Sequence, residues 1–306
     1  MSDTPAWIAV DWGTSRFRAF AVSETGQAIA RVRSDKGMSG LAPQDFEAVL
    51  LSEVAPWLTS RSIRVLACGM VGARQGWTEV PYAKVGADLA TLRPLPVPTA
   101  DPRIEVHIVP GLSQDTPPDV MRGEEMQIAG FLASHPDFTG SLCLPGTHSK
   151  WCRVENGHLI SFRTLIVGEM FELFCKHSLL RHSVGDGWDE EVFRKSVTDV
   201  LIKGQDPLAL LFAIRAQGLL QDMSTAAATA RLSGLLLGAE LRAADVSSDQ
   251  GAVALVGGTD HCARYKSALD IVGCRAQTFD GEDMVVAGLS QIAQYMGQNP
   301  TMAHAP

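Results

Sequence analysis

Two segments far apart in this chain carry the same order of strands and turns. The first, WIAVDWGTSRFRAFAVSETGQAIARVRS, reads as an apolar strand, a Gly13-Thr14 loop, a strand, a Thr25-Gly26 turn and a third strand. The second, SLCLPGTHSKWCRVENGHLISFRT, repeats this order with a Gly146-Thr147 loop and an Asn156-Gly157 turn, which is typical of β-hairpins. The register is close but not identical, and glycine turns are common in unrelated hairpins. The repeated order favours a duplicated structural unit.

Three apolar strands of the sequence end in glycine together with threonine or serine. The loops are Asp11-Trp12-Gly13-Thr14-Ser15, Pro145-Gly146-Thr147-His148-Ser149-Lys150 and Gly257-Gly258-Thr259-Asp260. Glycine lets the backbone approach an anion closely, and the backbone N–H groups and hydroxyls of such loops are donors to phosphate oxygens. No GxxxxGK[ST] motif occurs and no GxGxxG follows a strand, which excludes a Walker loop and argues against a dinucleotide site. We therefore expect these loops to bind the phosphates of a nucleotide.

Asp11 lies where the first strand meets the first glycine loop. We predict that Asp11 binds Mg²⁺ there, directly or through water, because Mg²⁺ prefers oxygen ligands and keeps several waters. The alternative is an aspartate that only accepts backbone hydrogen bonds in its own turn. The two further glycine loops favour the metal site.

The length and composition are those of a globular protein of more than one domain. At 306 residues, with 46% hydrophobic and 20% charged residues, the chain predicts two lobes with a cleft between them. No apolar run is long enough to cross a bilayer, and the N-terminal residues lack the order of a signal peptide. A cytoplasmic protein is the default expectation.

Charge and cysteine spacing exclude several classes of function. The net charge is −8 and no basic run occurs, which argues against nucleic acid or an anionic membrane as a partner. The six cysteines form no C-x-x-C pair and the eight histidines have no ligand spacing, so neither a disulfide framework nor a zinc site is indicated.

The remaining segments alternate between strand and helix patterns. We expect helices over residues 46–57, 189–203, 207–220, 225–243, 262–269 and 283–296, strands over 64–67, 104–109 and 252–257, and a loop in the proline-rich stretch 93–102.

Further motifs, spread over nearly the whole chain, point to one family. They are GMVGARQGW (69–77), Pro81-Tyr82, MRGEE (121–125), LPGTHSKW (144–151), FRT with Gly168-Glu169, SGLLLGAE (233–240), and LVGGT (255–259) with Arg264-Tyr265. With the two glycine hairpins, these segments resemble the 2-dehydro-3-deoxygalactonokinases, a family of the sugar kinase, heat-shock protein and actin superfamily.

The resemblance implies an α/β fold of two related ribonuclease H-like lobes, the actin-like ATPase fold, with the active site in the cleft between them. It also implies ATP-dependent phosphorylation of a 2-keto-3-deoxy sugar acid at its 6-hydroxyl, with Gly257, Gly258 and Thr259 holding the adenosine. We expect an N-terminal lobe of residues 1–118 with the first phosphate loop and part of the substrate site. A C-terminal lobe of residues 119–306 would carry the second phosphate loop and the adenosine site, with the last helix packing back on the N-terminal lobe.

Phosphoryl transfer depends on positioning and charge neutralisation, helped by a carboxylate that takes the proton of the attacking hydroxyl. In related sugar kinases this carboxylate stands at a helix start before the second phosphate loop, where this chain has Glu124 and Glu125. Both are longer than the aspartate that is usual there. We favour Glu124 over Glu125; the alternative for either is the common enrichment of acids in the first turn of a helix.

Several side chains before that helix could line a sugar-acid pocket. The candidates for substrate binding are Gly72, Arg74, Gln75, Trp77, Tyr82 and Arg122. A guanidinium such as that of Arg122 suits a substrate carboxylate, although a solvated surface arginine is the alternative. Trp77 and Tyr82 could instead only cover the edge of a lobe.

Glu169 is a further candidate for substrate binding, but its place at a helix start is explained as well by favourable N-terminal charge. Lys150 could neutralise the transferring phosphoryl group or could be a strand-edge lysine. The segment SGLLLGAELRAA, with Gly234 and Gly238 four residues apart, indicates close helix packing or a hinge rather than chemistry.

The sequence thus predicts a cytoplasmic Mg²⁺- and ATP-dependent kinase for 2-dehydro-3-deoxy-D-galactonate. A kinase for the gluconate epimer or another sugar is an alternative, as is a non-catalytic nucleotide-binding regulator of the same fold. A homodimer is left open.

Overall fold

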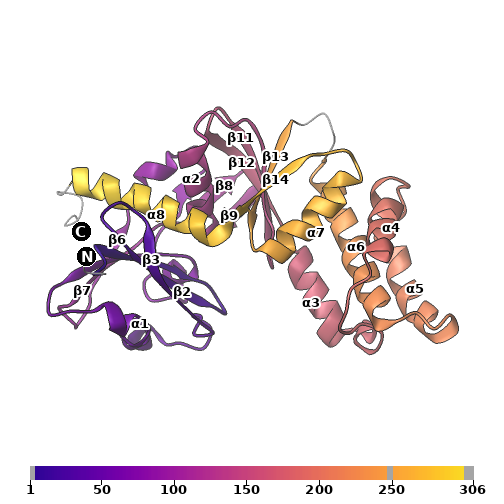
Figure 1. Cartoon of the computed structure of the whole chain (residues 1–306), viewed down its shortest axis with the longest axis horizontal. Coiled ribbons are helices and arrows are strands. Elements are labelled where there is room, and N and C mark those ends of the chain that lie inside the picture. Colours follow the sequence, from indigo (N-terminus) through magenta and orange to yellow (C-terminus); the bar gives the residue numbers. More distant parts are fainter. Residues whose placement is uncertain (1–3, 247–250, 300–306) are drawn as a thin grey trace. The chain divides into compact units, whose positions relative to one another are not determined.

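The computed structural model describes residues 4–246 and 251–299 (Figure 1). Contacts between residues divide this chain into two units. Unit 1 consists of residues 4–138, 155–161 and 281–299, and unit 2 of the described residues within 139–154 and 162–280. Each unit is built on one large mixed β-sheet.

The large sheet of unit 1 has the strand order β3-β2-β1-β4-β7-β6. Its strands are β1 (Trp7–Trp12), β2 (Phe17–Val22), β3 (Ala28–Ser34), β4 (Ile63–Cys68), β6 (Leu95–Val97) and β7 (Ile104–Ile108). The central strands β1, β4 and β7 are parallel, while β2, β3 and β6 run antiparallel to their neighbours. β6 lies in the stretch predicted as a loop; its Pro96 is tolerated because β6 is an edge strand.

The sheet of unit 2 has the order β12-β11-β10-β13-β14. Its strands are β10 (Gly140–Leu144), β11 (Ser149–Glu155), β12 (His158–Leu165), β13 (Ala252–Gly257) and β14 (Ala276–Asp280). The first hairpin strand again pairs antiparallel with the second and parallel with a later strand. Asn156 and Gly157 both have positive φ, as the predicted hairpin turn requires. The two sheets therefore share one topology, which confirms the predicted duplication.

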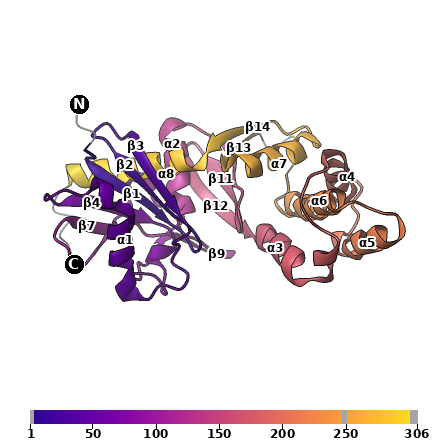
Figure 2. The same ribbon diagram turned by 60° about the horizontal axis from the view of Figure 1, so that its bottom comes forward.

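Alternation along β1 separates a core from a polar edge. Ile8, Val10 and Trp12 belong to the hydrophobic core that includes Phe46 of α1 (Phe46–Val54). Because successive side chains of a strand face opposite sides, Asp11 points to the other face of the sheet. The C-terminal helix α8 (Gly281–Gln298) contacts β1, and α1 and α8 lie on opposite sides of the sheet (Figures 1 and 2).

Helices α2 (Glu124–Ser134) and α8 pack closely within unit 1. A Cβ atom on Gly130 would lie 1.9 Å from the Met284 carbonyl oxygen, and one on Gly288 would lie 2.1 Å from that of Met126. Only glycine permits this approach. The division into units therefore falls at residue 138 rather than at the predicted residue 118, because α2 stays with α8.

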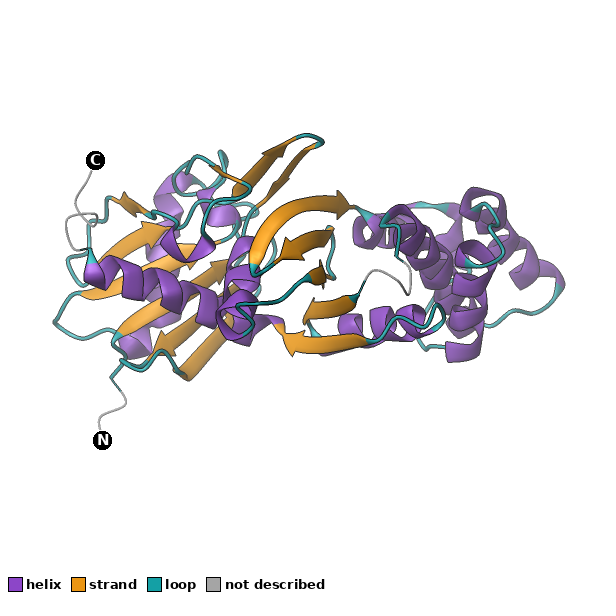
Figure 3. Ribbon diagram, turned by 90° about the horizontal axis from the view of Figure 1, so that it is seen from above, coloured by secondary structure: helices purple, strands orange, loops and turns teal. Residues whose placement is uncertain are grey.

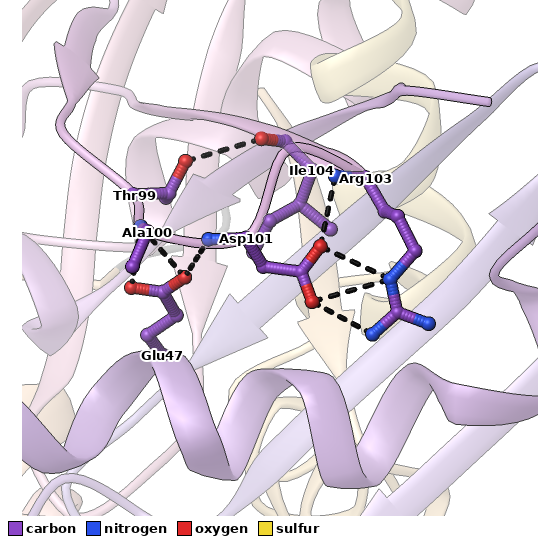
Figure 4. A network of polar contacts seen from close by, with 6 residues as sticks. All are labelled: Glu47, Thr99, Ala100, Asp101, Arg103 and Ile104. Carbon is purple, nitrogen blue, oxygen red and sulfur yellow. Dashed lines mark hydrogen bonds and ion pairs between the residues drawn. The ribbon is translucent and has the colours of Figure 1, made fainter. Parts of the chain in front are cut away.

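A polar network joins α1 to the segment before β7 (Figure 4). The Glu47 carboxylate accepts hydrogen bonds from the backbone N–H groups of Ala100 and Asp101, at 2.9 and 2.7 Å. Asp101 in turn accepts from the backbone and the guanidinium of Arg103. These bonds fix the loop between β6 and β7 on the side of the sheet that carries α1.

Unit 2 carries a group of helices between β12 and β13: α3 (Val167–His177), α4 (Glu190–Leu201), α5 (Pro207–Leu220) and α6 (Thr225–Ala243) (Figure 3). α7 (Thr259–Asp270) follows β13. Gly234 and Gly238 of α6 lie against the backbone of α4, where a Cβ on Gly234 would be 2.5 Å from the Phe193 carbonyl oxygen. This close packing agrees with the structural role predicted for SGLLLGAE.

A three-stranded sheet of β5 (Ala83–Lys84), β8 (Leu112–Asp115) and β9 (Pro118–Met121) completes unit 1. Within residues 4–246 and 251–299, no helix combines the length and apolar content needed to cross a bilayer.

Candidate active site

In unit 1, the parallel strands β1 and β4 end side by side, with Asp11 paired in register to Cys68. The backbone before α2 approaches this edge closely. A Cβ on Gly69 would lie 2.8 Å from the Trp12 carbonyl oxygen and 3.4 Å from Asp11 Oδ1, and one on Gly123 would lie 3.1 Å from the Gly69 Cα. Glycine at both positions lets the start of α2 reach the carboxyl ends of the strands, where open α/β sheets bind ligands.

Asp11 is held by an ion pair at this edge. Arg18 Nη1 lies 2.6 Å from Asp11 Oδ2, and Arg18 Nε lies 3.6 Å from Glu282 Oε1 at the start of α8. Burial raises the pKa of Asp11, while Arg18 lowers it and Glu124 raises it. The Asp11 side chain is only 13% exposed, so its charge depends on these neighbours.

Glu124 and Glu125 open α2 but have different surroundings. Glu125 is fully buried, and its Oε2 accepts a hydrogen bond of 2.6 Å from the Gly123 N–H. Burial, with the Glu124 charge second, raises the pKa of Glu125 to about 8. Glu124 is partly buried and accepts a 3.1 Å hydrogen bond from the Arg122 N–H. Glu124 is thus the one of the two that a ligand at this edge could contact.

Arg122 is buried beside the two glutamates. Its Nη2 donates to the Val80 carbonyl oxygen at 2.9 Å, and its guanidinium carbon lies 4.1 Å from the centre of the Tyr82 ring. A Cβ on Gly72 would lie 3.0 Å from Arg122 Nη1. Among the residues that the structure describes, Arg122 Nε and Nη1 have no hydrogen-bond partner. The structure therefore brings together Gly72, Tyr82, Arg122 and the glutamates.

The other substrate candidates of unit 1 do not join this group. Arg74 and Gln75 are exposed, and Arg74 lies 3.9 Å from a Glu79 carboxylate oxygen. Trp77 stacks on Phe46 at 6.1 Å between ring centres and contacts the ring of Trp12, so it completes the core.

The first glycine loop is exposed at Thr14 and Ser15 and is supported from behind. Met38 and Ser39 donate backbone hydrogen bonds to the carbonyl oxygens of Gly13 and Thr14, at 3.0 and 2.9 Å. These backbone hydrogen bonds hold the loop in place and leave the exposed residues Thr14 and Ser15 accessible to a ligand.

The second glycine loop lies in unit 2 against the start of α3. The Glu169 N–H donates to the Thr147 carbonyl oxygen at 2.9 Å, and the Glu169 carboxylate lies 2.7 Å from His148 Nε2. A Cβ on Gly168 would lie 2.3 Å from the Gly146 carbonyl oxygen. Thr147 and His148 are exposed, so they remain accessible to a ligand.

Ser149 and Lys150 point inward instead. Ser149 is fully buried and donates to Glu240 Oε1 at 2.8 Å, and Lys150 Nζ donates to the His148 carbonyl oxygen at 3.0 Å. The same Glu240 oxygen accepts from Trp151 Nε1 at 2.9 Å and from the Tyr265 hydroxyl at 2.8 Å. Glu240 of α6 therefore ties the strand after the loop to α7.

A pocket of about 260 Å³ within unit 2 opens beside this loop. It is bounded by the second glycine loop, α3, α6 and α7. Its lining residues are Gly146, Thr147, Val167, Gly168, Phe171, Glu172, Ser233, Leu236, Leu237, His261, Arg264 and Tyr265. Arg264 stacks on Trp188, 4.6 Å from its ring centre. A mixed lining of aromatic, apolar and cationic groups suits a heterocyclic ligand with a phosphate tail.

The third glycine loop leads from β13 into α7. Gly258 is the N-cap residue of α7, and Thr259 is its first residue. Gly257 and Thr259 line a separate pocket of about 220 Å³ with Lys266 and Asp280. This loop lies in unit 2, as does the second loop.

The sequence was compared with known proteins. The family model described as 2-keto-3-deoxy-galactonokinase matches residues 11–292. This chain belongs to that family.

Two curated relatives align with this chain over almost its whole length. The protein named probable 2-dehydro-3-deoxygalactonokinase DgoK1 of Rhizobium meliloti (strain 1021) is 35% identical over 301 residues, 96% of this chain and 98% of its own. The 2-dehydro-3-deoxygalactonokinase of Escherichia coli (strain K12) is 33% identical over 297 residues, 95% of this chain and 98% of its own.

The fold of this chain is similar to those of solved structures. A crystal structure of a Sinorhizobium meliloti protein assigned as a 2-dehydro-3-deoxygalactonokinase superposes with a TM-score of 0.87 at 35% identity, covering 95% of this chain and 99% of its own. The activator of 2-hydroxyisocaproyl-CoA dehydratase from Clostridium difficile, with bound ADPNP, gives a TM-score of 0.51 at 12% identity, covering 96% and 97%. The predicted actin-like ATPase fold is confirmed.

Three residues in or near the candidate site were not predicted from the sequence. Arg18 and Glu282 lie far apart in sequence, and only the fold pairs them at Asp11. Glu240 stands within an otherwise small and apolar helical segment, where an unpaired acid is costly. The position of Glu240 within this apolar helical pattern was the one sequence feature from which its role could have been predicted.

Proposed function

We propose that this protein transfers the γ-phosphoryl group of ATP to the 6-hydroxyl of 2-dehydro-3-deoxy-D-galactonate, giving the 6-phosphate and ADP. Membership of the galactonokinase family supports this proposal most directly. The structural observation that carries it is the group formed by Asp11, Glu124 and the buried Arg122 at the carboxyl ends of β1 and β4. We place this carbohydrate kinase in the cytoplasm, where ATP is available.

We assign nucleotide binding to the glycine loops. In unit 2, the Gly146-Thr147 backbone and the exposed His148 would donate to phosphate oxygens, and the pocket bounded by α3, α6 and α7 would take the adenosine. Gly257, Gly258 and Thr259, which we also assign to adenosine binding, precede the α7 residues of that pocket, although Gly257 and Thr259 line the separate pocket. In unit 1, the hydroxyls of Thr14 and Ser15 would also donate to phosphate oxygens. Ser149 and Lys150 would support the loop rather than touch the nucleotide.

Asp11 fits the Mg²⁺ that such a kinase requires. Mg²⁺ is bound through one or two carboxylates together with phosphate oxygens and waters. When bound, the ion neutralises charge on the phosphates. The ion pair with Arg18 would orient the Asp11 carboxylate for this role and partly offset the effect of burial, which raises its pKa.

Glu124 is the proposed general base. As the 6-oxygen attacks the γ-phosphorus, the bond from that phosphorus to the β,γ-bridging oxygen breaks, ADP leaves, and Glu124 takes the hydroxyl proton. Glu125 is too deeply buried for this step, and its raised pKa keeps it protonated near neutral pH. Its hydrogen bond to Gly123 would instead hold the first turn of α2 in place.

Arg122 is the proposed partner of the substrate carboxylate. Its buried N–H groups without a partner would form charge-assisted hydrogen bonds with a carboxylate, while Tyr82 and Val80 keep the guanidinium in place. Glu169, next to His148, would contact a substrate hydroxyl.

ADP release tests this function. With Mg²⁺ and ATP, purified protein should release ADP with 2-dehydro-3-deoxy-D-galactonate, more slowly with its gluconate epimer, and not with a neutral hexose. Absence of turnover with every keto-deoxy acid, in well-folded protein, would refute the proposal.

A further inference from the structure

Helix α5 of unit 2 has an unusual combination of sequence and exposure. Its sequence, PLALLFAIRAQGLL, contains a single charged residue, Arg215. Helices that are apolar on all sides are normally buried. In α5, however, only Ile214 is buried. Leu210 and Leu211 are partly buried against the core of unit 2, and the other large apolar side chains of this helix are exposed.

The exposed side chains of α5 are large. Leu208 is 72% exposed, Phe212 66%, Leu219 63% and Leu220 83%. Leu208, Phe212 and Leu219 are spaced by four and seven residues, so they form one stripe along the helix. Leu179, in the neighbouring turn Leu179–His182, is exposed as well. We call Leu179, Leu208, Phe212, Leu219 and Leu220 the α5 face.

We propose that the α5 face binds the α5 face of a second copy of this chain, so that the protein is a homodimer with a two-fold axis. Together the five side chains expose on the order of 600 Å², which approaches the ~800 Å² that each partner buries in a stable interface. Apolar patches of this size are at the upper end of what monomers expose and often mark interaction sites.

The lack of acids within α5 makes this face compatible with a second copy. The chain carries a net charge of −8, so two copies repel each other over most of their surfaces. Within α5 no acidic residue occurs, and the Arg215 guanidinium is directed to Ser183 Oγ, 3.4 Å away. The nearest acids in sequence, Asp206 and Asp222, lie beyond the two ends of the helix, so its apolar stripe itself brings no carboxylates together. A two-fold interface then pairs the stripe with itself.

The proposed interface leaves the nucleotide pocket open. None of the residues lining that pocket belongs to α5, and α5 lies on the outer side of the helices of unit 2 (Figures 1 and 2). Dimerisation would thus bury apolar surface without blocking the proposed ATP site. The inference does not depend on the proposed kinase activity.

Sedimentation velocity and light scattering over a wide range of protein concentration test the proposal. Wild-type protein should have twice the 32.8 kDa mass of one chain. Phe212→Glu and Leu219→Glu should each sediment as monomers, because each substitution places two carboxylates, one from each copy, in the apolar interface. Circular dichroism and ADP release should show that both variants are folded.

Ile29→Glu is the matched control, since Ile29 is an exposed apolar residue, 43% exposed, in β3 of unit 1. This variant should remain a dimer. A monomeric wild-type protein at all concentrations would overturn the proposal. So would a dimer that both glutamate variants of α5 leave intact, because the interface would then lie elsewhere.

Discussion

Glu124 and Glu125 follow each other at the start of α2, yet only Glu125 is removed from solvent. Its Oε2 turns back to the Gly123 N–H at 2.6 Å, whereas Glu124 Oε2 accepts from the Arg122 N–H at 3.1 Å and remains partly exposed. We therefore propose different tasks for these adjacent carboxylates: Glu125 anchors the start of the helix, and Glu124 takes part in the chemistry.

Glu124→Gln should lower kcat by about 10²–10⁴-fold, the usual effect of losing a general base, with little change in KM for ATP. The glutamine keeps the hydrogen bond from Arg122 but cannot take the substrate proton. Steady-state ADP release measures both constants. Unchanged kcat would exclude Glu124 and direct attention to Glu125 or Glu169.

Glu125→Gln should change the pH dependence of stability. Between the ordinary pKa of 4.5 and the folded-state pKa of about 8, the folded protein retains a proton that the unfolded chain has released. The stability that protonated Glu125 contributes is complete below pH 4.5 and is lost as the pH rises through 8, by up to about 1.4 kcal/mol per pH unit. Glutamine cannot titrate, so the variant should lose this slope.

Urea unfolding at several pH values measures that slope in wild type and variant. The wild-type free energy of unfolding should fall relative to that of Glu125→Gln as the pH is raised from 5 to 8. Parallel curves for the two proteins would show that Glu125 does not carry a proton in the folded state.

Glu240→Ala should destabilise unit 2 by about 3 kcal/mol and raise KM for ATP, because the buried donors of Trp151 and Tyr265 lose their acceptor and the strand after the second glycine loop is freed. Glu240→Gln retains an acceptor oxygen and should restore most of both properties. If the glutamine variant is as impaired in KM as the alanine variant, the hydrogen bonds are not what positions the loop.

Gly130→Ala should destabilise the protein by about 3 kcal/mol, since its Cβ would meet the Met284 carbonyl oxygen at the crossing of α2 and α8. Gly297→Ala is the control in α8: nothing lies within 4 Å of its Cβ, so alanine should be neutral or stabilise by about 0.5–1 kcal/mol. Thermal unfolding distinguishes the two. Equal effects would mean that the helices can separate at no cost.

The sequence predicted the repeated hairpins because their turns are local signals. Asn156-Gly157 and the first two glycine loops fix strand ends within a few residues, and the structure has strands on both sides of each of these turns. The helices over 207–220 and 225–243 were predicted with the same bounds that the structure has, since caps such as Ser224 and Asp206 mark their starts.

Elements defined by distant contacts were harder to predict. β6 was predicted as a loop because proline, here Pro96, is uncommon in strands other than edge strands. The helix predicted over 46–57 ends as α1 at Val54, because Pro56 lies in a 3₁₀ turn that follows it. The division at residue 138 depends on Gly130 meeting Gly288, which no local pattern reveals.

The same limit applies to the candidate site. Asp11, Glu124 and the glycine loops could be named from spacing and family resemblance. Side-chain packing decides the remaining placements, which the sequence does not reveal. Trp77 stacks in the core, Ser149 and Lys150 point inward, and Arg18 pairs with Asp11.

Phosphorus NMR of a completed reaction tests the central claim most directly. With the protein, Mg²⁺, ATP and 2-dehydro-3-deoxy-D-galactonate, the account predicts ADP and one new phosphate monoester whose phosphorus couples to the two protons of the terminal carbon. ADP with only inorganic phosphate, or a monoester on another carbon, would contradict it.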